Sequence, residues 1–533
     1  MQLPSDVEIL ISGATVVDGT GGSRHAGTVA IRGGRLHIGD VGWRPRAGRT
    51  IDGSGKVVAP GFIDLHSHGG LMILADPRHE PKVRQGVTTE IIGVDGNGYA
   101  PFAHRHDLEA FVRLNAGLDG DPPIDHDWNT VASYLDRYDR GQALNVGIMV
   151  GNSALRIGAI GWEDEPADEA AITNMRAMLR EAMQWGAFGV SSGLDYPPGS
   201  YASTDELAAL TAEAARHGGF YHTHVRYPLG DRFLDPFREA IEVGRRGEGP
   251  AHITHFYHRQ SYPGPPEEQL ALVDDARASG QDVSFDMYPY EWASTRLLIQ
   301  LPQWVQSGGP TVLKDRLAVR GIRDRIRSEL AARGAAYTGM AGWADVRLGA
   351  FTRPENLRWE SRTIAEVMDE TGHDAVDVIC DLLLSEDLRV SQVTSGPHTD
   401  GLRRFLQHPL AMIGTDSTFL GDKPSPRTYG SFPRILGQFV REEALLSLEE
   451  AVHRMTGAPA ARLGLRERGL LRDGFAADVV VFDPATVRAN ATYDEPRQFP
   501  DGIEQVIVNG IAVVDGGVHT GATPGRALRH SST

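Results

Sequence analysis

The sequence predicts an α/β fold: a TIM-type (β/α)8 barrel with a small β-sandwich domain built from both termini and an inserted lid subdomain. Three observations support this prediction. Short apolar runs alternate with helical stretches through the middle of the chain, strand-rich stretches with glycine turns occupy both ends, and one connection is much longer than the others. Alternation of this kind is typical of parallel strands joined by helices.

Strand-rich sequence lies at both ends of the chain. Residues 7–60 contain short β-branched runs separated by glycine-rich turns, and the same pattern returns in residues 477–483 and 506–515. Two β-rich ends that flank a different middle predict one small β-sandwich, assembled from residues 1–59 and residues 461–533.

The middle of the chain, residues 60–460, contains eight apolar runs that we interpret as the barrel strands. Amphipathic helical stretches, such as residues 204–217 and 267–279, lie between them. The connection between the seventh and eighth runs is too long for one helix, so residues from about 298 to 353 are predicted to form a lid over the barrel mouth. The eight predicted strands are residues 62–66, 89–93, 145–151, 189–192, 221–224, 251–255, 283–288 and 411–416.

The composition narrows the class of protein. The 533 residues carry a formal net charge of −17, which argues against nucleic acid or an anionic membrane as a partner. The single cysteine, Cys380, excludes a disulfide framework and a cysteine-based zinc site, and we expect it to be a small core residue. No signal peptide or membrane-spanning run is apparent, so we expect a cytoplasmic protein whose oligomeric state the sequence leaves open.

Side chains with the chemistry of metal ligands stand at the ends of several predicted strands. His66 and His68 are one residue apart, and because side chains alternate along a strand, both imidazoles point the same way. A single histidine at a strand end is more often structural, but the carboxyl ends of all strands in a parallel barrel meet at one mouth. The sequence therefore predicts a divalent-metal site there, formed by His66, His68, Asp95, His224, His255 and Asp416.

Longer motifs contain or flank these residues. They are PGFIDLHSH at 60–68, QGVTT at 85–89, SGLDYPPG at 192–199, MYPY at 287–290, GTD at 414–416 and PRTYGSFPR at 426–434. With these motifs nearly the whole chain resembles the amidohydrolase superfamily and, within it, the N-acyl-D-amino-acid deacylase (D-aminoacylase) family. The resemblance implies a barrel with a two-part β-sandwich, one or two zinc ions per chain, and hydrolysis of an acyl amide.

The resemblance also implies roles for the predicted ligands. His224 and His255 match the ligands of a tightly held zinc ion, whereas His66, His68 and Asp416 match a second and often weaker site. The position of Asp95 is a bridging cysteine in the family. A carboxylate can also bridge two divalent ions, although it is a harder ligand and can change the metal preference.

Zinc beside an aspartate predicts a hydrolytic mechanism. Zinc lowers the pKa of a bound water to about 7, which makes hydroxide available near neutral pH. We expect this metal-bound hydroxide to attack the amide carbon while a metal stabilises the oxyanion. Asp416 is expected to act as general base and acid, taking the proton of the water and delivering it to the leaving nitrogen.

Four further residues match positions that contact the substrate in the family. Arg427 suits a substrate carboxylate by its bidentate geometry, and Tyr288 and Ser294 can donate hydrogen bonds. Tyr257 stands where the family has a lysine, which changes the charge expected beside the substrate. His222 lies one step deeper in the barrel than His224, where the alternatives are a residue that supports the metal ligands and a satisfied core residue, and we expect the latter.

Three functional hypotheses follow. The first is a zinc-dependent hydrolase of a small N-acyl substrate, an N-acyl-D-amino acid or a related N-acyl compound. The second keeps the metal but acts on a cyclic amide, an imide or a lactone, or catalyses a lyase reaction. The third is a metal-free binding protein, which would lack the ligands that the present sequence retains at every position.

Overall fold

Parallel strands form the centre of the computed structural model, which describes residues 3–227, 232–258, 264–333, 342–394 and 401–531. They belong to two sheets, ordered β6-β7-β8 and β17-β13-β12-β11-β10-β9. Each of the eight predicted strands overlaps an observed one, which confirms the barrel. The bounds are β6 (Phe62–Asp64), β7 (Val87–Ile92), β8 (Asn145–Ile148), β9 (Val150–Gly151), β10 (Gly189–Gly193), β11 (Phe220–His224), β12 (Ala251–Ile253), β13 (Val283–Met287) and β17 (Ala411–Ile413).

Hydrogen bonds beyond the regular strands close the two sheets into one ring. On one side β8 continues into β9, and Met149 N donates to Ile92 O at 2.8 Å. On the other side Ser67 and Ser417 form a parallel bridge, flanked by the bond from Asp416 N to His66 O at 2.8 Å. This second junction, which we call the β6–β17 seam, joins segments about 350 residues apart.

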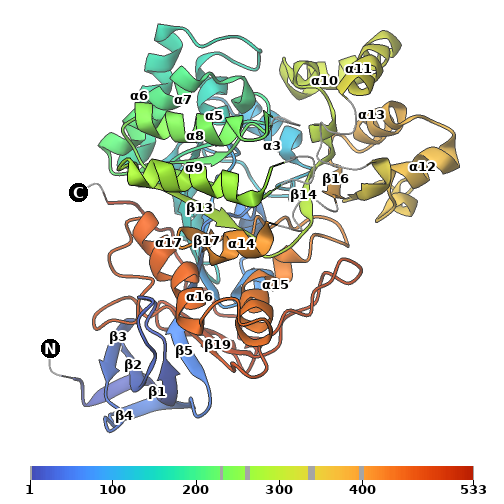
Figure 1. Cartoon of the computed structure of the whole chain (residues 1–533). Helices are drawn as coiled ribbons and strands as arrows, with labels where there is room; N and C mark the ends of the chain where they lie inside the picture. The colour runs from blue at the N-terminus through green and yellow to red at the C-terminus, as the bar shows by residue number, and fades with distance from the viewer. Residues whose placement is uncertain (1–2, 228–231, 259–263, 334–341, 395–400, 532–533) are drawn as a thin grey trace.

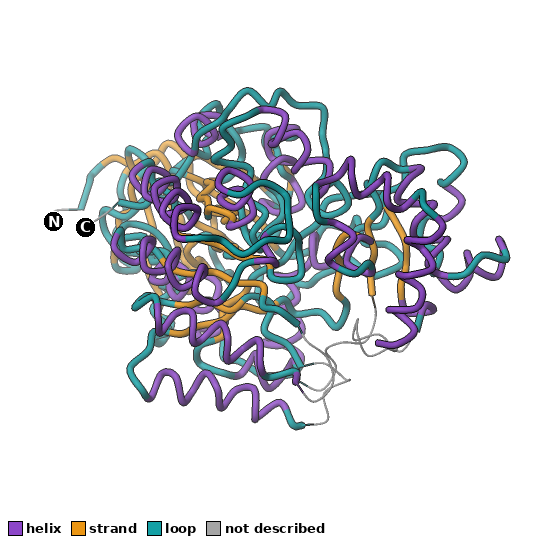
Figure 2. Tube along the Cα trace, turned by 90° about the horizontal axis from the view of Figure 1, so that it is seen from above, coloured by secondary structure: helices purple, strands orange, loops and turns teal. Residues whose placement is uncertain are grey.

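Helices surround the barrel, as the view from above shows (Figure 2). Helix α7 illustrates why these stretches are helical: Ser203 accepts a hydrogen bond from Glu206 N as N-cap, and apolar residues recur on the buried face. The helices α5 (Asn152–Ala159), α6 (Glu169–Gln184), α7 (Thr204–Arg216), α8 (Asp235–Arg246) and α9 (Pro266–Ala278) cover one side (Figure 1). The others near the barrel are α1 (Gly70–Ala75), α2 (Glu80–Val83), α3 (Arg105–Asn115), α4 (Val131–Tyr138), α14 (Leu402–Gln407), α15 (Arg427–Arg434), α16 (Leu448–Met455) and α17 (Gly457–Arg462).

Strands from both ends of the chain form one nine-stranded sheet, which confirms the predicted β-domain built from both termini. The two ends meet where β5 pairs with β18 in antiparallel register. Val479 and Val481 of β18 pack into the core of this domain, whereas Val480 and Phe482 pack into the barrel core, so both faces of the strand are buried. The strands are β1 (Asp6–Val16), β2 (His25–Arg32), β3 (Arg35–Gly39), β4 (Arg46–Asp52), β5 (Val57–Pro60), β18 (Val479–Phe482), β19 (Ile503–Val508), β20 (Ile511–Asp515) and β21 (Val518–His519).

A third group of elements lies between β13 and β17 in the sequence (Figure 1). Its antiparallel sheet, ordered β14-β16-β15, and its helices enclose a separate apolar core that contains Cys380, as predicted for that residue. Residues 334–341 of the predicted lid lie outside the described residues. The predicted domain boundaries stay a proposal: they are 1–59, 60–460 with an insertion at about 298–353, and 461–533. The elements are β14 (Ala293–Arg296), β15 (Val346–Gly349), β16 (Ser391–Thr394), α10 (Gly309–Leu317), α11 (Arg320–Arg333), α12 (Ile364–Thr371) and α13 (Ala375–Ser385).

The helices that the structure describes are all too short or too polar to cross a bilayer.

A buried ion pair supports the β6–β17 seam. The Asp64 carboxylate accepts hydrogen bonds from Thr415 N at 2.9 Å and His66 N at 3.2 Å, and Lys82 Nζ contacts the same carboxylate. Asp64 and Lys82 have no exposed side-chain surface. The lysine therefore neutralises the carboxylate that holds both sides of the seam together.

Replacing Lys82 by alanine should destabilise the fold, because it leaves the Asp64 charge buried and unpaired. We expect a loss of about 3–5 kcal/mol in unfolding free energy, measured by chemical denaturation. Lys314→Ala is the matched control: its partner Asp387 is 51% exposed, so the loss should be below about 1 kcal/mol. Equal losses in the two variants would contradict the structural role of the buried pair.

Candidate metal centre

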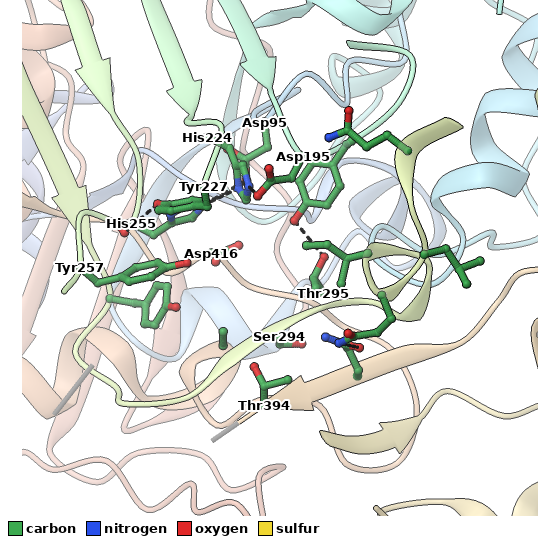
Figure 3. Close-up of a pocket in the computed structure, with 18 residues that line it drawn as sticks. Asp95, Asp195, His224, Tyr227, His255, Tyr257, Ser294, Thr295, Thr394 and Asp416 are labelled. Atoms are coloured by element: carbon green, nitrogen blue, oxygen red, sulfur yellow. Dashed lines mark hydrogen bonds and ion pairs between the residues drawn. The ribbon is translucent and has the colours of Figure 1, made fainter. Parts of the chain in front are cut away.

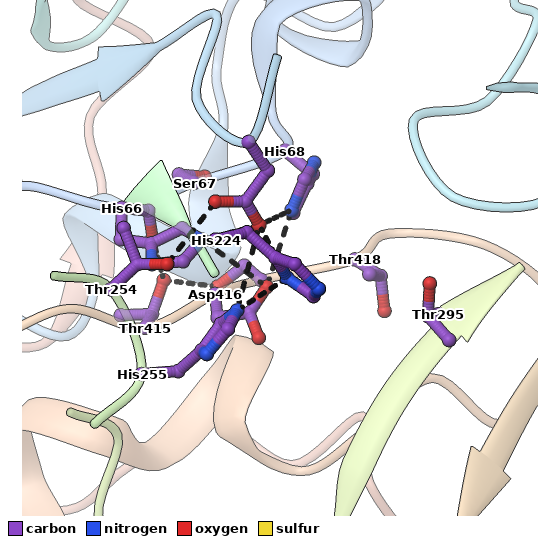
Figure 4. A network of polar contacts seen from close by, with 12 residues as sticks. His66, Ser67, His68, His224, Thr254, His255, Thr295, Thr415, Asp416 and Thr418 are labelled. Carbon is purple, nitrogen blue, oxygen red and sulfur yellow. Dashed lines mark hydrogen bonds and ion pairs between the residues drawn. The ribbon is translucent and has the colours of Figure 1, made fainter. Parts of the chain in front are cut away.

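The structure brings all six predicted ligands together at the mouth of the barrel. Figure 4 labels five of them, His66, His68, His224, His255 and Asp416. The Asp95 carboxylate lies in the middle: its Oδ2 is 3.1 Å from His66 Nε2, 3.5 Å from His68 Nε2, 3.7 Å from His224 Nδ1 and 3.8 Å from His255 Nε2. Asp416 completes the cluster, with Oδ1 at 3.2 Å from His68 Nε2. Segments 350 residues apart in the sequence thus share one site.

The cluster divides into two donor groups that share Asp95. One contains His66, His68, Asp95 and Asp416; the other contains Asp95, His224 and His255; within each group the donor atoms lie within 4.8 Å of one another. Donor atoms around one tetrahedral zinc ion lie about 3.3 Å apart, given bonds of about 2.0–2.1 Å. The donors are buried imidazole nitrogens and carboxylate oxygens, so their chemistry and spacing suit one or two divalent ions with Asp95 between them.

Three of the six side chains leave the backbone in a left-handed conformation. The φ angles are +52° at Asp95, +32° at His255 and +48° at Asp416, all just beyond the end of a barrel strand. Residues other than glycine rarely adopt this conformation, and it persists only where surrounding contacts enforce it. Asp416 N donates to His66 O at 2.8 Å and His255 N donates to Asp286 Oδ1 at 2.9 Å, so two of the three turns are held by hydrogen bonds.

Each of the four histidines has a second polar partner on the ring nitrogen that faces away from Asp95. These partners are Asp286 for His66 (3.3 Å), Asp119 for His68 (2.6 Å), Asp195 for His224 (3.1 Å) and the Tyr227 hydroxyl for His255 (2.7 Å). A partner of this kind sets the tautomer and the orientation of a metal-binding imidazole.

Reasoning from the sequence did not identify these partners. The sequence does carry a signal for two of them: Asp195 lies inside the motif at 192–199, and Asp286 directly precedes the motif at 287–290. Asp119 lies in a loop after α3 with no such signal.

The cluster has a strong local electric field. Burial opposes the charged form of His66, but the carboxylates of Asp95 and Asp286 outweigh it and raise the pKa of His66 to about 10. Burial likewise opposes ionisation of Asp416, yet the Arg427 guanidinium and His66 lower its pKa to about 2. The carboxylates are therefore ionised at neutral pH, and their field favours a cation among the imidazoles.

A pocket opens directly beside the cluster (Figure 3). Its lining includes four members of the cluster, Asp95, His224, His255 and Asp416, and the predicted substrate residues Tyr257, Tyr288 and Ser294. The lining also includes aliphatic and amide side chains, which are Ile299, Gln300, Leu301, Gln303 and Gln392. The site can therefore hold an organic molecule against the two donor groups.

Arg427 lies behind this pocket rather than in its lining. It is fully buried, its Nη2 is 2.9 Å from Asp416 Oδ2 and donates to Ser294 O at 3.0 Å, and its guanidinium stacks on the Tyr288 ring at 4.4 Å. Its Nε and Nη1 have no hydrogen-bond partner in the described part of the chain. The predicted carboxylate-binding arginine thus already contacts one carboxylate, that of Asp416.

Several known proteins are similar to this chain over nearly its whole length. The sequence model of the amidohydrolase family matches residues 49–514. An N-acyl-D-aspartate deacylase of Alcaligenes xylosoxydans xylosoxydans is 35% identical over 98% of this chain and 95% of its own length, and a D-aminoacylase of the same organism is 33% identical over 98% of both. The crystal structure of N-acyl-D-glutamate deacylase from Bordetella bronchiseptica, complexed with zinc and a phosphonate inhibitor, superimposes with a TM-score of 0.82 at 32% identity, over 98% of this chain and 100% of that one. These matches confirm the resemblance seen in the motifs.

Loss of the shared carboxylate should weaken metal binding more than loss of an outer partner. We expect Asp119→Ala to raise the Kd for zinc by roughly 10–100-fold, since it only releases the ring of His68. Asp95→Ala removes a donor from both groups and should raise the Kd beyond that range. Competition with a chromophoric chelator measures both values, and an Asp95→Ala protein with the zinc affinity of the wild type would refute the shared role of Asp95.

Proposed function

The chain belongs to the amidohydrolase family and is a metal-dependent hydrolase of carbon–nitrogen bonds other than peptide bonds, and from that premise we propose that it is a zinc-dependent deacylase of N-acyl-D-amino acids or related N-acyl compounds. One observation carries the proposal above all: Asp416 belongs to the donor cluster and to the wall of the pocket at once. This position supports a role for the Asp416 carboxylate as proton acceptor beside a bound substrate.

The cluster at the mouth would hold one or two zinc ions through its six members, His66, His68, Asp95, His224, His255 and Asp416. When bound, zinc polarises a carbonyl group and acidifies a coordinated water. The two oxygens of Asp416 are not equivalent: Oδ2 pairs with Arg427 at 2.9 Å, whereas Oδ1 faces His66 and His68. The Asp416 carboxylate, oriented by Arg427 at Oδ2, would accept the proton of the attacking water and deliver it to the leaving nitrogen.

Four side chains are proposed to bind the substrate. Nε and Nη1 of Arg427 have no hydrogen-bond partner among the described residues, and guanidinium suits a carboxylate. Arg427 is fully buried, however, so a substrate carboxylate would reach it only if Tyr288 or Ser294 shifts. Tyr288 and Ser294 lie between Arg427 and the pocket, so they can reach the same carboxylate. Tyr257 stacks on Tyr227 at 5.2 Å with their rings 10° apart, and it lines the pocket on the side of His255.

We also infer the compartment of the protein and the kind of molecule that it binds. A net charge of −17 and a single buried cysteine support a cytoplasmic enzyme that acts on a small molecule and has no nucleic acid or membrane partner. A cyclic amide, imide or lactone, or a lyase substrate, is the alternative, and the observation that favours it is Tyr257 at the position of a family lysine.

A substrate panel tests the proposed class of reaction. Zinc-loaded protein should release free amino acids from N-acetyl-D-amino acids and not from their L-enantiomers. The corresponding carboxamides should react with a kcat/KM lower by about 10–100-fold, because a charged hydrogen bond contributes roughly 1.5–3 kcal/mol. Arg427→Ala should abolish this preference for the free carboxylate. If the protein hydrolyses only hydantoins, imides or lactones, the alternative is favoured and the deacylase proposal is refuted.

The role of Asp416 has a separate test. Asp416→Asn keeps the shape of the side chain but cannot accept a proton, so kcat should fall by about 10²–10⁴-fold while most of the zinc stays bound. Asp494→Asn, whose side chain is 89% exposed, is the matched control and should behave as wild type. Steady-state kinetics and metal analysis on the same samples separate the two effects; near-normal turnover in Asp416→Asn would refute the assignment.

A further inference from the structure

A second cluster of metal-ligand chemistry lies one layer deeper in the barrel than the catalytic centre. It consists of His222 on β11, His252 on β12 and Asp286 on β13, three adjacent strands of one sheet. All three side chains are completely buried. None of them lines the substrate pocket, so this cluster, which we call the inner triad, is separate from the reacting groups.

His222 is the unusual member of the inner triad. Neither of its ring nitrogens has a hydrogen-bond partner among the described residues, although its exposed fraction is 0%. The expectation that His222 is a satisfied core residue is therefore wrong. A buried polar group without a partner is costly, and such a group in a native protein points to a bound water or ion.

The other two members are hydrogen-bonded to each other through the atoms that they offer to the inner triad. His252 Nδ1 is 2.8 Å from Ser284 Oγ, which leaves its Nε2 to face Asp286 Oδ2 at 3.0 Å. Asp286 uses Oδ1 for His255 N at 2.9 Å and His66 Nδ1 at 3.3 Å, so Oδ2 remains for the inner triad. His222 Nε2 lies 3.9 Å from that same oxygen.

The two distances to Asp286 Oδ2, 3.0 Å from His252 and 3.9 Å from His222, lie on either side of the donor spacing around a zinc ion. Donor atoms that share a tetrahedral zinc ion lie about 3.3 Å apart, whereas 3.9 Å is too long for a direct hydrogen bond. Each residue of the inner triad offers one donor atom, and the three atoms lie within 4.8 Å of one another. Two imidazoles and one carboxylate form a set that suits zinc and neighbouring transition metals.

We propose that His222, His252 and Asp286 bind a divalent transition metal ion of the zinc type in a fully buried site with three protein ligands. The ion would give His222 the partner it lacks and would link β11, β12 and β13 beneath the mouth. It would also anchor Asp286, the residue that orients His66 and holds the turn at His255. The proposal is independent of the substrate, so it stands or fails separately from the deacylase assignment.

Anomalous diffraction gives the direct test. Crystals of the full chain grown with zinc and measured above the zinc absorption edge should show an anomalous peak between His222, His252 and Asp286, apart from any peaks at the mouth. Water-like density without anomalous signal at that position would overturn the proposal.

Chelation in solution tests whether the site is closed. A chelator should remove the metal at the mouth and abolish activity, yet wild-type protein should retain about one equivalent of zinc because the inner triad is fully enclosed. His222→Leu should retain none. His106→Leu, whose histidine side chain is 78% exposed, is the control and should retain the wild-type amount. A resistant equivalent that survives in His222→Leu would place it elsewhere and refute the assignment.

The change in Tm caused by His222→Leu differs in direction according to whether the inner triad holds an ion. Without an ion, His222→Leu removes two unpaired buried nitrogens, so the Tm should stay unchanged or rise. With an ion, the variant loses a ligand and the Tm of zinc-replete protein should fall by several degrees. A fall of this kind supports the proposal, and an unchanged or higher Tm contradicts it.

Discussion

The β6–β17 seam is the junction on which the rest of the structure depends. A parallel barrel places its chemistry at one mouth only if the ring of strands closes, and here closure relies on a few bonds around His66, Ser67 and Asp416. The bond from Asp416 N to His66 O fixes the first and last strands relative to each other. The same bond sets the left-handed turn that directs the Asp416 carboxylate toward His66 and His68. The same contacts therefore close the barrel and position Asp416 in the site.

Charge balance explains how so many polar groups can be buried at that mouth. An isolated carboxylate is strongly destabilised away from water, and it is tolerated only with partners of opposite charge and enough hydrogen bonds. Asp95 is surrounded by four imidazoles, and Asp416 lies between histidines on one side and Arg427 on the other. A cation in the cluster adds to the same balance. The arrangement of these carboxylates therefore favours positive charge at the mouth.

Asp286 connects successive layers of the barrel. Its Oδ1 contacts His66 and the backbone of His255 in the upper layer, and its Oδ2 contacts His252 in the lower one. Since β11, β12 and β13 each contribute a polar side chain to the lower layer, the interior beneath the mouth is not a purely apolar filling. Asp286 therefore links the polar side chains of the lower layer to His66 and His255 above them.

The sequence by itself determined the architecture and the six members of the cluster at the mouth. Local patterns are enough for this, because apolar runs of strand length, their alternation with helices, and polar residues at the ends of runs are properties of short segments. His66, His68, His224 and Asp416 all lie at or just past the end of a predicted strand.

Only the tertiary structure decided which ring nitrogen of each histidine faces Asp95, that Asp119 and Tyr227 orient His68 and His255, and that Arg427 pairs with Asp416. It also decided that His222 lacks a partner. These properties depend on side chains from remote segments packed against one another in a closed ring, and no local periodicity encodes the distance between two such atoms.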